Sequence, residues 1–276
     1  MPKICEECFR LDNERMLKVE FFDTHAHYDD EKFDEDREEI IKKIYNSGVT
    51  RVINVGCNIE TSIKSIELSE KYEFIYSMCG IHPSDIANNE EQIKQDILAI
   101  KNLVTKSKKT VAIGEIGLDY YWNKEDKNLQ KKAFIKQINL ANTLRLPIAI
   151  HTRDAIDDTI EIIRNNKINN GGILHCCPFN RELVKHGLEA GLNIAFGGTS
   201  TFKNSKNAAE IVNMVPRDKI LTETDSPYLA PEPLRGTRND SSNLKYIVAK
   251  IAEFRGETKE EVAKYTYENA NRLLGI

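Results

Sequence analysis

The sequence predicts an α/β protein, a single-domain (β/α)₈ barrel of the TIM type. Its 276 residues suit such a barrel, which typically needs about 250 residues. Short apolar runs alternate with longer amphipathic segments, a pattern typical of a parallel sheet covered by helices. Polar residues capable of catalysis follow six of the apolar runs. Such residues surround a closed ring better than they line the single crevice of a doubly wound open sheet, the alternative fold.

Eight apolar runs are predicted to form the buried strands of the barrel. Each is short, rich in β-branched residues and followed by a polar or glycine-containing segment. The strands are expected at residues 19–22, 52–55, 74–78, 111–113, 148–150, 173–174, 192–196 and 220–221.

Helical spacing and capping residues mark the segments between the runs. The first helix should end before Gly48, in the position that favours a left-handed glycine. Thr258 and Glu261 match a capping box at the start of the last helix. The predicted helices cover residues 39–48, 63–72, 134–144, 156–163, 183–190, 242–254 and 259–273.

Composition excludes some classes of protein and leaves others open. With 40% hydrophobic and 30% charged residues, the chain is typical of a soluble enzyme, and it has no apolar stretch long enough to cross a membrane. The start of the chain lacks the apolar core of a signal peptide, so we expect a cytoplasmic protein. The net charge of −4 argues against a generic polyanion binder but not against a nuclease, because bound divalent metals add positive charge locally.

Residues 1–17 are expected to be an N-terminal extension and residues 18–276 the barrel domain. The extension contains Cys5 and Cys8 in a CxxC pattern, without a second pair to complete a zinc site. We therefore interpret both as free thiols, and we expect all six cysteines to be reduced.

Histidines and carboxylates at the strand ends predict a metal site. His25 and His27 alternate on the first strand, so both imidazoles face one side and can chelate one cation. Glu115, in an apolar context after the fourth strand, needs a buried partner, and its two oxygens could bridge two cations. His151 and His175 end neighbouring strands and could hold a second cation.

The segment after the eighth strand carries two further carboxylates. Asp225 should lie beside the first strand in a closed barrel, where it could bind the first metal and accept a proton from the attacking water. Glu223 is expected to support the ligands from behind.

Substrate contacts are predicted at four positions. His82, in a loop with no second ligand nearby, is expected to hydrogen-bond a phosphate or leaving group. Arg153 is a candidate phosphate clamp, although an ion pair with a neighbouring aspartate is an equal alternative. Arg235 and Arg238 are weaker candidates in a loop on the same face. Of Cys176 and Cys177, at most one should face the site, since strand neighbours point to opposite sides.

These motifs resemble the TatD family of metal-dependent deoxyribonucleases. The likeness covers about residues 20–275 and includes FFDTHAHYDD, GIHPSD, AIGEIGLDYY, LPIAIHTRDA, LTETDSPYLAP and RGTRNDSSNL. It implies a TIM-like barrel with two metals, one held by His25, His27, Glu115 and Asp225. Glu115 would bridge to the second metal, held also by His151 and His175. The His175-Cys176-Cys177-Pro178 turn departs from the family's usual sequence, which leaves the substrate preference of that loop open.

The resulting prediction is a hydrolase that cleaves DNA phosphodiester bonds, as a 3′–5′ exonuclease acting on single-stranded ends. Asp225, Glu115 and His82 are the expected catalytic residues, and two divalent ions (Mg, Zn, Mn, Co or Ni) the cofactors. We expect a monomer. One alternative is an amidohydrolase-type enzyme acting on an amide, ester or aminoacyl ester, since the same centre could attack a carbonyl. Another is a catalytically silent nucleic-acid-binding or scaffolding protein that merely keeps the barrel.

Overall fold

The computed structural model describes residues 19–122 and 124–276, which form an eight-stranded parallel barrel. Each strand pairs with the next one along the chain, so the order is sequential from β1 to β8. This order confirms the barrel and excludes the doubly wound alternative. The strands are β1 Phe21–Ala26, β2 Val49–Gly56, β3 Ile75–Cys79, β4 Thr110–Asp119, β5 Ile148–Arg153, β6 Gly172–Leu174, β7 Leu192–Phe196 and β8 Ile220–Thr222.

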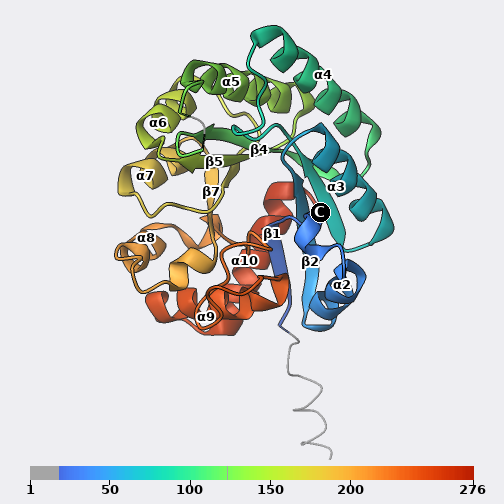
Figure 1. Ribbon diagram of the computed structural model, residues 1–276. Coiled ribbons are helices and arrows are strands. Elements are labelled where there is room, and N and C mark those ends of the chain that lie inside the picture. The colour runs from blue at the N-terminus through green and yellow to red at the C-terminus, as the bar shows by residue number, and fades with distance from the viewer. Residues whose placement is uncertain (1–18, 123) are drawn as a thin grey trace, which may run out of the picture.

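The helices form a layer around these strands (Figure 1). All seven predicted helices are present, and the capping box between Thr258 and Glu261 forms as expected. Helices α4 and α8 were not predicted. The α-helices are α2 Arg37–Asn46, α3 Ile59–Lys71, α4 Glu90–Lys106, α5 Lys127–Leu144, α6 Ile156–Asn165, α7 Arg181–Glu189, α8 Ala208–Met214, α9 Leu244–Arg255 and α10 Lys259–Leu274. Short 3₁₀ helices occur at η1 Glu31–Phe33, η2 Gly198–Thr201, η3 Arg217–Lys219 and η4 Ser241–Asn243.

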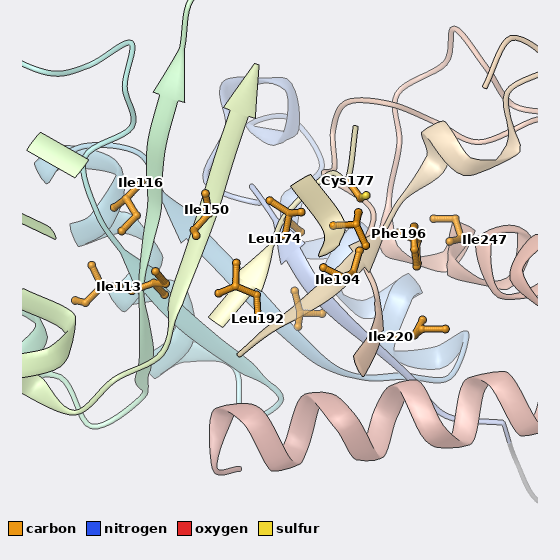
Figure 2. Close-up of a cluster of buried hydrophobic side chains, with 14 of the residues drawn as sticks. Ile113, Ile116, Ile150, Leu174, Cys177, Leu192, Ile194, Phe196, Ile220 and Ile247 are labelled. Carbon is orange, nitrogen blue, oxygen red and sulfur yellow. The ribbon is translucent and has the colours of Figure 1, made fainter. Parts of the chain in front are cut away.

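The buried apolar residues form two clusters, one on each side of the sheet. The larger cluster lies between strands and helices and includes Ile194 and Phe196 of β7 (Figure 2). The intervening residue Ala195 belongs to the second cluster, with other strand residues and with Ala270 and Leu274 of α10. This alternation is expected of strands covered on both faces. Because α10 contributes to the second cluster, its C-terminal half packs against the barrel interior.

The junction between β1 and β8 closes the barrel with few ladder hydrogen bonds. Its only strand-type pairing among the described residues is one parallel bridge, Ala26 to Ser226. Side chains complete the junction, as when the Thr24 hydroxyl donates to the Thr222 carbonyl oxygen at 3.1 Å. Asp23 accepts the Thr224 amide at 2.9 Å and the Thr224 hydroxyl at 2.5 Å. We call this junction the seam.

The predicted extension, residues 1–17, lies outside the described residues, as do Cys5 and Cys8. Among the residues that are described, no helix is both long and apolar enough to cross a membrane. The cysteines in this part of the chain, Cys57, Cys79, Cys176 and Cys177, are free thiols.

Candidate metal centre

The structure brings the six predicted ligands together at the carboxyl ends of the strands. His25 is in β1, and His27 follows that strand directly. Glu115 is in β4 and His151 in β5, while His175 comes one residue after β6. The sixth residue, Asp225, follows β8 across the seam, where its amide donates to the carbonyl oxygen of His25 at 2.9 Å.

Four of these side chains form a first group around one point. The Nε2 atoms of His25 and His27 are 3.2 Å apart. Glu115 Oε2 lies 3.4 Å from the former and 3.9 Å from the latter. Asp225 Oδ1 lies 3.4 Å from His27 Nε2 and 3.9 Å from His25 Nε2.

A second group uses the other oxygen of Glu115. Its Oε1 lies 2.8 Å from His151 Nδ1 and 3.6 Å from His175 Nε2. The two oxygens of one buried carboxylate therefore face two different sets of imidazole nitrogens. This is the arrangement that a carboxylate bridging two cations requires.

The spacing of the donor atoms fits a transition-metal or zinc ion. Two nitrogens bound tetrahedrally at 2.0–2.1 Å would be about 3.3 Å apart, close to the separation of the His25 and His27 Nε2 atoms. Buried imidazole nitrogens in such contact need either a shared proton or a cation between them. Imidazole with carboxylate is also a common donor set for divalent metals.

Further buried carboxylates fix the orientation of two imidazoles. Glu223 Oε2 lies 2.9 Å from His175 Nδ1, so that Nε2 faces the centre. Asp119 Oδ2 lies 3.1 Å from His151 Nε2, so that Nδ1 faces Glu115. Such partners select the tautomer of a metal ligand and raise its basicity. Glu223 was expected in this role, whereas Asp119 was not assigned one, although it ends the apolar segment of β4.

The charges of the site are strongly coupled. Burial raises the pKa of the Glu115 carboxyl, but the His175, His25 and His82 imidazoles outweigh it and hold this pKa well below its usual range. Burial lowers the pKa of His175, yet Glu223 and Glu115 raise it to about 9. Ionised carboxylates thus favour a positive charge on His175, and a divalent cation can supply that charge instead.

One expectation about a neighbouring residue was wrong. His82 does have potential ligands nearby, because its Nε2 is 3.9 Å from Glu115 Oε1 and its ring packs on His151 with centroids 4.5 Å apart. Cys176 and Cys177 both border the cleft, but Cys177 is buried and packs in the larger apolar cluster between strands and helices (Figure 2). This agrees with the expectation that at most one of the two faces the site.

The centre lies in a cleft of about 1010 Å³. Arg153 and His82, two of the four predicted substrate contacts, are among its lining residues, and their contact with substrate stays a prediction. Arg235 and Arg238 do not line the cleft. Arg238 instead pairs with Asp36 by donating from both terminal guanidinium nitrogens, at 2.8 and 2.5 Å. The Arg235 guanidinium lies 4.2 Å from the centre of the Phe202 ring. Their binding of substrate stays a prediction.

A sequence model of the family described as TatD related DNase matches residues 22–275. The chain belongs to the TatD family. The metal-dependent hydrolase YabD of Bacillus subtilis, itself uncharacterized, is 43% identical over 92% of this chain and 99% of its own length. The 3′–5′ ssDNA/RNA exonuclease TatD of Citrobacter rodentium is 31% identical over 92% of this chain and 98% of its own.

Solved structures agree on the fold. The Escherichia coli TatD homologue YjjV superposes with a TM-score of 0.88 at 24% identity, covering 94% of this chain and all of that one. Together with the donor groups described above, these likenesses identify the chain as a metal-dependent hydrolase of the TatD family.

Proposed function

We propose that this TatD-family hydrolase cleaves phosphodiester bonds of single-stranded DNA from the 3′ end, using two divalent cations. The observation that carries the proposal is the division of the Glu115 oxygens between two donor groups. A carboxylate bridge between two cations is typical of enzymes that hydrolyse phosphate esters. The exonuclease named among the relatives supports the same substrate class.

The two cations would neutralise the phosphate oxygens and lower the pKa of the attacking water. The side chains of the protein supply the remaining functions. Asp225, whose Oδ1 lies in the first donor group, accepts the proton of that water. His82 donates from Nε2 to the diester or to the leaving oxygen, because its Nδ1 is engaged with the Ser84 hydroxyl at 2.6 Å. Arg153 orients the diester through its planar guanidinium.

Buried carboxylates keep this arrangement rigid. Glu223 and Asp119 hold two of the imidazoles from behind, and Glu223 also accepts the Cys176 amide at 2.7 Å. A centre supported in this way loses little free energy to reorganisation when substrate binds.

The test is a hydrolysis assay with metal-reconstituted protein and oligonucleotides labelled at the 5′ end. Linear single strands should shorten stepwise from the 3′ end, while a 3′-phosphorylated strand and a circular strand should resist. The Asp225→Asn protein is the matched control for contaminating nucleases. Cleavage of amide or ester substrates, with all oligonucleotides left intact, would contradict the proposal and favour the amidohydrolase alternative.

A further inference from the structure

We propose that Tyr121, Trp122 and Arg153, called here the stacking platform, bind a nucleobase of the substrate strand beside the metal centre. The inference rests on the proposed function, because it assigns a contact to the substrate of that same site. The platform would take an unpaired base of any sequence, since every base offers a flat π-face.

The platform combines two exposed aromatic side chains with an arginine of the cleft. Trp122 is 69% exposed and Tyr121 is 47% exposed, and Trp122 and Arg153 both line the cleft. The Arg153 guanidinium lies 4.0 Å from the centre of the Tyr121 ring and 5.6 Å from that of Trp122. Exposed aromatic and arginine faces at a binding cleft are suited to stacking with a ligand.

One carboxylate connects the platform to the metal centre. Asp119 Oδ1 accepts the backbone amides of Tyr121 and Trp122, each at 2.9 Å. Its Oδ2 holds His151 Nε2 at 3.1 Å. On the other side, the Tyr120 amide donates to the Arg153 carbonyl oxygen at 2.9 Å. The turn that carries the two rings is therefore fixed relative to a predicted metal ligand.

The charge of the cleft indicates that cationic side chains of the protein provide little of the affinity for a nucleic acid. Among the described residues that line the cleft, Lys64 and Arg153 are the only lysine and arginine. Seven carboxylates face them: Asp29, Asp30, Glu31, Asp85, Glu115, Asp119 and Asp225. Proteins that hold a nucleic acid chiefly through its phosphates present many more cations than this. Binding here must draw on uncharged contacts in addition to the metals.

Another cleft aromatic is already engaged within the protein. The Tyr228 hydroxyl donates to Asp30 at 2.6 Å. Trp122, with the larger exposed fraction, is the better stacking surface.

The chain contains a single tryptophan, so its fluorescence reports on the platform directly. The probes are a single-stranded oligothymidylate and an oligomer of equal length with abasic residues at its 3′ end. Phosphorothioate versions of both are used for binding to the metal-loaded protein. Only the base-bearing strand should quench Trp122, and the KM for hydrolysis of the abasic strand should be roughly 10- to 100-fold higher.

Variants test whether Trp122 causes this preference. Trp122→Ala should bring the ratio of the two KM values close to one, whereas Trp122→Phe, which keeps an aromatic face, should retain most of it. Tyr45→Ala removes an exposed aromatic on α2 outside the cleft and should leave the ratio unchanged. The ratio is measured within each protein, so it does not depend on the yield of folded variant.

The outcomes separate the platform from the proposed hydrolysis. Equal KM values and equal quenching for the two strands, with both hydrolysed, would overturn the platform alone. An unchanged ratio in Trp122→Ala would do the same. Quenching by the base-bearing strand without hydrolysis of either strand would support the platform and contradict diester hydrolysis.

Discussion

Replacing Glu223 by glutamine tests how strongly the second donor group depends on its support. Glu223 is completely buried, and its two oxygens serve His175 Nδ1 at 2.9 Å and the Cys176 amide at 2.7 Å. A glutamine has one oxygen and one NH₂ group. If the oxygen stays with Cys176, the NH₂ donates to Nδ1 and the proton of His175 moves to Nε2, the atom that faces the centre. If the amide turns, two N–H donors face each other in a buried space.

Both orientations of the glutamine side chain predict weaker metal binding. Partners of ligating histidines typically contribute about 10- to 100-fold in metal affinity or activity. Because neither orientation of glutamine satisfies every group, we expect the upper end, a loss of about 100-fold, or roughly 2.7 kcal/mol. The affinity should fall only for the metal held by His151 and His175. The affinity for the other metal should stay within a few-fold of the wild-type value.

Competition with a chromophoric chelator measures the two affinities separately, and circular dichroism confirms that the variant is folded. Glu253→Gln, which neutralises an exposed carboxylate on α9, is the control and should bind both metals normally. Wild-type affinity at both sites in folded Glu223→Gln protein would refute the assignment of Glu223 as the support of a ligand.

Three further predictions concern the centre and the chain terminus. Glu115→Gln should lower kcat roughly 1,000-fold or more with the fold intact, because a neutral amide cannot bridge two cations; near-normal turnover with both metals bound would contradict this. Asp225→Asn should weaken metal binding about tenfold and lower kcat about 100-fold or more; full recovery of rate in excess metal would exclude the proton-accepting role. A chain starting at Met16 should keep two metals, its turnover and most of its Tm; a large fall in Tm would assign residues 1–15 a part in the fold.

The sequence predicted all eight strands because buried parallel strands are continuous apolar runs with distinct ends. Helix α4 could have been predicted as well, since Ile93, Ile97, Ile100 and Val104 have helical spacing and Asn89 caps the first turn. The seven-residue helix α8 is too short for its period to be read.

The predicted ligands converge because each lies in a strand or within three residues of a strand's carboxyl end. Loop residues were harder to predict, because the path of a loop depends on contacts that the sequence does not display. His82 reaches Glu115 and Arg238 turns to Asp36 for this reason. The role of Asp119 depended on the length of β4, which has ten residues and not the three that the apolar run suggested.

The seam also determines at which stage of protein synthesis the metal centre can form. Its side-chain bonds join residues about 200 positions apart, as from Thr24 to Thr222. During synthesis the N-terminal strands leave the ribosome first. A nascent chain therefore carries His25 and His27 long before Glu223 and Asp225 have been translated. The order of translation keeps the centre incomplete until most of the protein has been made.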